Sequence, residues 1–170
     1  MFCSLTAKTA RGEIMWITLL QVAALVLPWF SLPFLKGNAI KRYLPVTVFA
    51  TLLVSILFQI ADTYEWWTMH RYILPWGYLV EISVVYGIFP VGTLWIFYLS
   101  YRRLWIYIVT NLAVNTIFTF IGIPLILEGL GIVSFVNLEH WQWFLIAMIL
   151  SFVIYGYQMW QEGIFKEEKA

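Results

Sequence analysis

Apolar residues gather in five long runs that are separated by short polar stretches. The runs cover residues 14–35, 44–61, 73–99, 104–127 and 141–160. A helix needs about 20 apolar residues to cross the hydrocarbon core of a bilayer, so each run predicts a transmembrane helix. The stretches between the runs are too short to form a soluble domain. The pattern therefore predicts an all-α, polytopic membrane helical bundle of about five helices, with residues 1–170 as a single integral membrane domain.

The third run is longer than a crossing needs, and two prolines interrupt it. Pro90 has no N–H to donate and crowds the carbonyl of Tyr86, so we expect a kink in this helix. Pro75 and Gly77 leave a second interpretation open, in which the helix begins near Ser83 and residues 73–82 lie at the membrane interface.

The composition supports a membrane protein. Hydrophobic residues make up 62% of the chain and charged residues only 11%, whereas a soluble domain carries about 25% charged residues. The formal net charge of +1 gives no indication of a nucleic-acid partner. The bilayer is the expected partner, and a homo-oligomer or a membrane partner subunit is a further prediction.

Basic residues are distributed unequally between the two ends of the predicted helices. Cytoplasmic loops are enriched in Lys and Arg, and with five crossings the ratio is seven to three. The seven lie on the predicted inner side and comprise Lys36, Lys41, Arg42, Arg102, Arg103, Lys166 and Lys169. The three on the outer side are Lys8, Arg11 and Arg71. This bias predicts a cell-membrane protein with its N-terminus outside and its C-terminus in the cytoplasm.

Tryptophans lie near both ends of the apolar runs, where interfacial aromatic belts are expected. Trp66, Trp67 and Trp143 are among those near the predicted outer boundary, and Trp29 and Trp95 are among those near the inner one. This distribution predicts two aromatic belts and supports the boundaries of the runs.

Polar residues recur at intervals of four within the second and fourth runs, which aligns them along one side of each helix. They are Thr47, Thr51, Ser55 and Gln59 in one run and Asn111, Asn115 and Thr119 in the other. Two interpretations stay open. These stripes either form hydrogen bonds within the bundle, typically of about 0.6 kcal/mol each, or line a polar pathway or binding pocket. Thr and Ser can also bond the carbonyls of their own helix.

Glu81 is the strongest single candidate for a functional residue. A carboxylate within the hydrocarbon core is energetically expensive and is a functional candidate by default. There it would be protonated or paired with a donor from another helix, such as Gln59 or Asn115. If the third helix begins near Ser83, Glu81 instead lies among the lipid headgroups.

Catalytic and metal-binding motifs are not found in the sequence. There is no P-loop, GxGxxG, GxSxG, HExxH or CxxC pattern, and this favours a non-enzymatic protein without a cofactor. Several potential ligands lie near the predicted outer side, but their spacing matches no strong metal pattern. They include Asp62, Glu65, His70, Glu139 and His140. We therefore expect solvated charges and local salt bridges there.

One part of the chain carries a family resemblance. Residues 127–160 read LEGLGIVSFVNLEHWQWFLIAMILSFVIYGYQMW, with an amphipathic connection followed by an aromatic and charged cluster. Together with Glu81, Tyr86 and Pro90, this stretch resembles a family of small, uncharacterised, aromatic-rich multi-span membrane proteins of Gram-positive spore-forming bacteria. The resemblance implies a bacterial cytoplasmic membrane location and assigns no activity.

Three functions are compatible with these patterns. The first is a non-enzymatic accessory or structural membrane module, which the lack of catalytic motifs favours. The second is a small oligomeric transporter or channel, with a polar pathway near Glu81 that Gln59, Asn111 and Asn115 could extend. The third is a lipid or apolar-ligand binder that uses the aromatic interior of the bundle.

Overall fold

The computed structural model describes residues 15–74, 79–100 and 103–167, which are mainly helical. The first helix runs through Met15–Phe34 and tightens into a 3-10 segment, η1 (Leu27–Phe34). Helix α2 (Gly37–Thr63) follows. The third helix joins a π-helical segment, η2 (Val84–Ile88), to α3 (Phe89–Ser100). Helix α4 (Leu104–Ile117) continues into a π-helical segment, η3 (Phe118–Glu128), and α5 (His140–Glu167) ends the described part.

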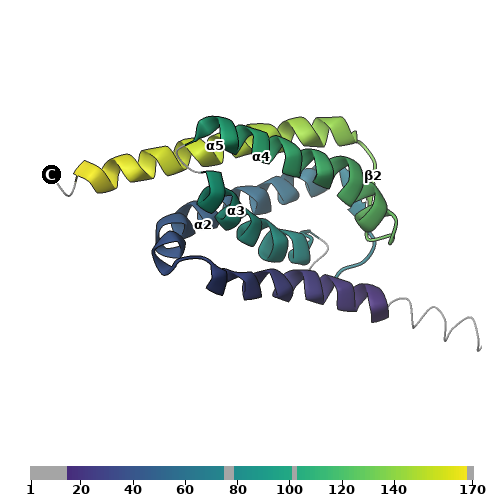
Figure 1. The fold of residues 1–170 in the computed structure, drawn as a ribbon. Helices are drawn as coiled ribbons and strands as arrows, with labels where there is room; N and C mark the ends of the chain where they lie inside the picture. The colour runs from purple at the N-terminus through teal and green to yellow at the C-terminus, as the bar shows by residue number, and fades with distance from the viewer. Residues whose placement is uncertain (1–14, 75–78, 101–102, 168–170) are drawn as a thin grey trace, which may run out of the picture.

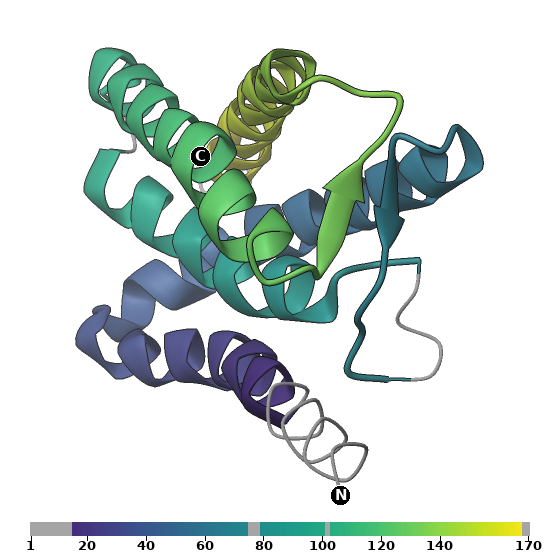
Figure 2. The ribbon, with the colours of Figure 1, turned by 90° about the vertical axis from the view of Figure 1, so that its right-hand side faces the viewer.

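Successive helices lie side by side and run in alternating directions (Figure 1). One end of the bundle carries the strands β1 (Trp67–Met69) and β2 (Val133–Phe135), and we call it the sheet end. The opposite end carries the turns at Leu35–Lys36 and before α4, and we call it the turn end. Figure 2 shows the third helix between the first helix and α4. Five alternating helices place Lys36, Lys41, Arg42 and Arg103 near the turn end and Arg71 at the sheet end.

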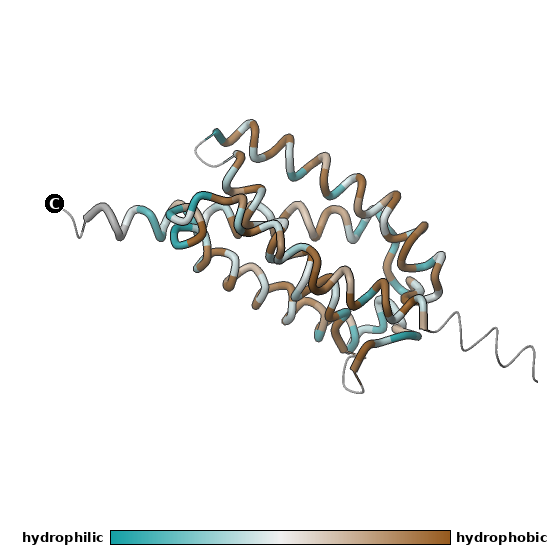
Figure 3. The backbone as a smooth tube through the Cα atoms, turned by 60° about the horizontal axis from the view of Figure 1, so that its bottom comes forward, coloured by the Kyte–Doolittle hydropathy of each residue, from teal (hydrophilic) through white to brown (hydrophobic). Residues whose placement is uncertain are grey.

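Four helices are long and apolar enough to cross a membrane, which confirms the predicted membrane helical bundle. They span Met15–Phe34, Gly37–Thr63, Leu104–Glu128 and His140–Gly163, and the third helix is shorter, at Val84–Ser100. Figure 3 shows hydrophobic positions along every long helix. The outward side chains include Leu19, Val48, Val109 and Ile149, all exposed, as lipid-facing residues should be. The protein is therefore embedded in a membrane.

The predicted bounds of the third helix, 73–99, are wrong at the N-terminal side. The helix begins at Ile82, and residues 73–74 and 79–81 are not helical, while residues 75–78 lie outside the described residues. Glu81 caps the helix, because its side chain accepts a hydrogen bond from the N–H of Val84 and its carbonyl accepts one from Val85. The structure thus has the later start that Pro75 and Gly77 left open.

The predicted irregularity of the third helix lies in η2. The N–H of Phe89 donates to the carbonyl of Val84, five residues back, as in a π-helix. Pro90 follows immediately and has no N–H with which to bond the carbonyl of Tyr86. The change from π to α winding at Phe89 is where the sequence predicts the kink, and π-turns are a known cause of bends in helices.

The first helix packs closely against the third at Gly87. A Cβ atom at this position would lie 2.5 Å from the carbonyl oxygen of Ala24 and 2.6 Å from the Cα of Leu25. Nearby, the indole N–H of Trp29 donates to the carbonyl of Tyr86 at 3.2 Å. Small residues allow this kind of backbone approach between membrane helices.

A two-stranded antiparallel sheet closes the sheet end, and the sequence patterns did not predict it. Trp67 pairs with Phe135 and Met69 with Val133. Trp67 is only 7% exposed and packs against Phe58 and Trp143, with ring centroids 5.0 and 5.2 Å away. Trp67 thus lies at an end of the bundle, as the sequence predicts, but its indole packs inside the protein and does not face the surroundings. Trp76 and the basic residues Lys8, Arg11, Arg102 and Lys169 lie outside the described residues.

Candidate ligand cavity

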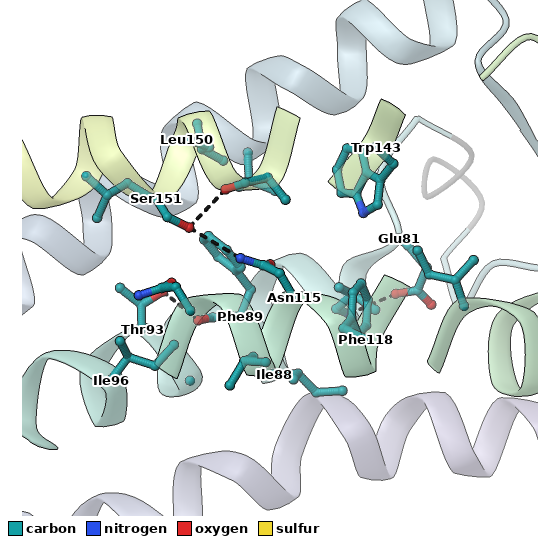
Figure 4. Close-up of a pocket in the computed structure, with 18 of the residues that line it drawn as sticks. Glu81, Ile88, Phe89, Thr93, Ile96, Asn115, Phe118, Trp143, Leu150 and Ser151 are labelled. Atoms are coloured by element: carbon teal, nitrogen blue, oxygen red, sulfur yellow. Dashed lines mark hydrogen bonds between the residues drawn. The ribbon is translucent and has the colours of Figure 1, made fainter. Parts of the chain in front are cut away.

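A cavity of about 190 Å³ lies between α2, the third helix, α4–η3 and α5, and the two strands close it at the sheet end. Its wall is mainly apolar and aromatic, with side chains such as Phe58, Phe89, Phe118, Trp143 and Leu150. Figure 4 shows several of these residues around the space. An engineered cavity of about 150 Å³ in a protein core binds benzene, so this one has room for a larger apolar group.

One wall of the cavity reaches the lipid-facing surface. Ile88 on η2 and Val114 on α4 both line the cavity, and they are 44% and 46% exposed. Their side chains therefore border the cavity and the outside of the bundle together. The cavity wall at Ile88 and Val114 is therefore partly exposed on the outside of the bundle.

Glu81 stands at the sheet-end limit of the cavity, near Trp143 (Figure 4). It is only 4% exposed. Oε1 accepts from the side-chain amide of Gln21 at 3.0 Å, and Oε2 accepts from the N–H of Val84 at 2.8 Å. The Ser83 hydroxyl lies 2.7 and 2.6 Å from the two oxygens. Three donor groups, one of them the Val84 N–H in the first turn of the helix, thus stabilise this carboxyl group.

The partners expected for Glu81 are not those found. Among the described residues, the inter-helix donor is Gln21 of the first helix, not Gln59 or Asn115. Gln59 is exposed on α2, so its place in a polar pathway near Glu81 is wrong. The reason is geometric: each step of four residues overshoots a full helical turn by about 40°, and three steps from Thr47 to Gln59 accumulate about 120°.

The other two predicted site residues, Asn111 and Asn115, do line the cavity. Asn111 is buried, and its amide donates to the carbonyl of Tyr107 at 3.0 Å. Asn115 makes longer contacts, 3.4 Å to the Ser151 hydroxyl and 3.7 Å to the Met148 sulfur. Figure 4 shows Asn115 and Ser151 pointing toward each other across the cavity. The α4 stripe therefore places a weakly engaged amide beside an apolar space.

The polar stripe on α2 has a different environment. Thr47, Thr51 and Ser55 each donate to the carbonyl four residues earlier, at 2.8 to 2.9 Å. None of these three residues is among those that line the cavity in the described structure. Their hydroxyls are satisfied by their own helix, as Thr and Ser side chains in membrane helices often are.

The charged residues at the sheet end form local pairs. His140 Nε2 lies 3.3 Å from Glu128 Oε2, and the His70 ring nitrogen lies 3.0 Å from the Ser134 hydroxyl. Within the described ranges, no group of three His, Cys, Asp or Glu residues is arranged to hold a metal ion.

Several residues that define the cavity were not singled out from the sequence. Gly92 lines it, and a Cβ there would meet no atom within 4 Å. Tyr107 also lines it, donates to the carbonyl of Ser151 at 2.8 Å and so ties α4 to α5. A glycine or tyrosine within an apolar run has no periodic signal that separates a cavity wall from packing.

Comparison with models of known protein families found no match, and comparisons with curated proteins and with solved structures likewise found none. We therefore infer the function from the cavity and the residues that line it.

Proposed function

We propose that this protein binds an elongated apolar molecule, such as a lipid acyl chain, in the cavity between α2, the third helix, α4–η3 and α5. The observation that carries this proposal is the lateral exposure of the cavity wall at Ile88 and Val114. Ligand sites are typically apolar concavities with a few placed polar groups, and this cavity has that character.

The polar groups favour a ligand with one hydrogen-bonding group. Among the described residues, the amide of Asn115 makes a 3.4 Å contact to the Ser151 hydroxyl and a 3.7 Å contact to the Met148 sulfur, so it can also donate to a carbonyl or hydroxyl oxygen of a ligand. Glu81 supports an ion pathway less well, because its two oxygens are already occupied by Gln21, Ser83 and Val84. A role as an accessory or structural membrane module and a role as a transporter or channel remain predictions from the sequence.

The test is native mass spectrometry of the protein released from membranes in mild detergent, with two matched variants. Gly92→Leu adds a side chain where the cavity is open, whereas Gly156→Leu adds the same side chain at an exposed position of α5 that is also free of contacts within 4 Å. Leucine is a better helix former than glycine, so both variants should fold.

We expect a co-purified apolar molecule on the wild type and on Gly156→Leu, and its loss from Gly92→Leu. Equal retention of the same molecule by both variants would place the ligand outside the cavity and refute the proposal. A wild-type protein free of bound lipid, which also takes none up from added lipid, would refute it as well.

We further propose that the protein lies in a bacterial cell membrane with its N-terminus outside and its C-terminus in the cytoplasm. The unequal distribution of basic residues supports this orientation. Leu5→Cys and Glu168→Cys, each in a Cys3→Ser background, test it with an impermeant thiol reagent on intact cells. We expect labelling at position 5 only, and labelling at position 168 would contradict the orientation.

A further inference from the structure

A second cavity, of about 350 Å³, lies at the sheet end between the first helix and the segment that follows β1. Ile17, Thr18 and Gln21 line it from the helix, and His70, Arg71 and Tyr72 line it from the segment. The amide of Gln21 also donates to Glu81, which lines the first cavity. We call it the Arg71 cavity.

Arg71 brings a positive charge to this cavity, and no ion-pair partner for it is found among the described residues. Its Nη1 atom is buried and has no hydrogen-bond partner among the described residues. The ion pairs found in the described part of the chain join Arg42 to Glu162 and His140 to Glu128, and Arg71 takes part in neither. Desolvating a cationic donor without an acceptor is unfavourable, so an acceptor from outside the chain would stabilise this arrangement.

The neighbouring polar groups leave the guanidinium available. Gln21 donates to Glu81 at 3.0 Å and only distantly, at 3.5 Å, to the backbone carbonyl of Arg71. The His70 ring bonds Ser134, on the adjacent strand. Tyr72 is exposed, so the cavity has an entrance at the surface. These contacts neither neutralise the charge of Arg71 nor fill the cavity.

The position and geometry of Arg71 favour a phosphate group. The planar guanidinium can bond two phosphate oxygens at once, and arginine is the residue best suited to such recognition. Arg71 lies at an end of the bundle, where lipid phosphates are found, and the first helix beside it exposes Trp16 and Leu20 to the surroundings. A lipid could therefore place its phosphate at Arg71 and its chains along the first helix.

We infer that the Arg71 cavity binds a phosphate group at the membrane surface. A phospholipid headgroup and inorganic phosphate share this chemistry. The inference is independent of the proposed apolar ligand, because it concerns different residues and a different cavity.

The experiment measures lipid binding by native mass spectrometry as phosphatidylglycerol is titrated into the detergent-solubilised protein. A phosphate-free glucosyl diacylglycerol with the same acyl chains serves as the parallel titration. Arg71→Gln removes the charge at the site, and Arg103→Gln is the matched control, because Arg103 is exposed at the turn end. A competition arm adds inorganic phosphate at constant ionic strength.

We expect Arg71→Gln to weaken the tightest phosphatidylglycerol binding about ten-fold or more, which corresponds to the loss of a charge-assisted hydrogen bond. Arg103→Gln should leave that binding unchanged. Competition by inorganic phosphate would identify free phosphate as a ligand of the same site, and lack of competition would identify the lipid headgroup.

Equal binding of the two lipids by the wild type would overturn the inference, as would unchanged phosphatidylglycerol binding by Arg71→Gln. The comparison of the two lipids uses the wild-type protein alone, so it tests phosphate recognition even if Arg71→Gln does not fold. Loss of binding in Arg71→Gln and Arg103→Gln alike would show a general charge effect and would also overturn it.

Discussion

The two sides of the third helix differ in how closely they meet their neighbours. On one side Gly87 lies so near the first helix that a Cβ atom would come within 2.6 Å of two backbone atoms. On another side, five residues later, Gly92 borders an open space of about 190 Å³. The same residue type thus serves a tight helix contact and a cavity wall.

This difference indicates that the two sides of the third helix have different roles. The Gly87 side, with Trp29 bonded to the Tyr86 carbonyl and Gln21 bonded to Glu81, fixes the third helix to the first. The Gly92 side leaves space that neighbouring helices do not fill. Well-packed interiors contain few large voids, so a cavity that persists beside a rigid contact is a candidate binding site.

The largest effect is expected from Gly87→Ala. The added methyl group would meet backbone atoms of Ala24 and Leu25, which cannot move without displacing the first helix. We expect a loss of about 3 kcal/mol in the free energy of unfolding, the upper part of the range for overpacking. Titration with denaturing detergent, followed by circular dichroism, measures it. Gly156→Ala, at an open position, should lose nothing, and equal stability of the two variants would contradict the tight contact.

Glu81→Gln should have the next largest effect. Three donor groups converge on the two oxygens of Glu81, and a glutamine amide offers only one oxygen to them. Leaving a buried donor unsatisfied costs about 1–3 kcal/mol, and we expect a loss of that size in unfolding free energy. The same titration measures it. Stability equal to that of the wild type would mean that the carboxyl group carries a proton and that the glutamine reproduces its bonds.

The smallest changes in stability are expected from substitutions in the two polar stripes, on α4 and on α2. Asn115→Leu removes the weak contacts to Ser151 and Met148, so we expect a loss of only about 0.6 kcal/mol in stability. Its effect on the co-purified ligand should be larger, because the donor in the cavity is lost. Gln59→Leu is the matched control on the exposed part of α2 and should change neither quantity. A ligand loss in Gln59→Leu and not in Asn115→Leu would reverse the assignment of the stripes.

The sequence predicted the helices well because crossing a bilayer imposes a length and an apolar composition that can be read directly. It also predicted that Asn111 and Asn115 face the inside of the bundle, with a hydrogen-bonding role and a pocket role both left open, and in the structure both residues line the cavity. The prediction that Gln59 faces the bundle was wrong, because residues spaced four apart shift gradually around an α-helix over several turns. Thr119 lies eight residues after Asn111 and is still buried, at the start of the wider π-helical turns of η3, whose position no sequence pattern marked.

Other features depended on contacts between distant segments. Ser83 and Val84 are neighbours of Glu81, yet the cap they form became visible only with the true start of the helix at Ile82. Strands of three residues are too short to show an alternating pattern, so the pairing of Trp67 with Phe135 was not predicted. The cavity is defined by six helical segments and the two strands together and has no local sequence signal.

The most direct test of the central claim is a crystal structure, in a lipidic mesophase, of the protein purified from its own membrane. We predict elongated density in the cavity beside Gly92, with a polar end within hydrogen-bonding distance of the Asn115 amide and an outer end between Ile88 and Val114. A cavity closed by inward movement of Phe118 and Leu150, with no space for a ligand, would contradict the account.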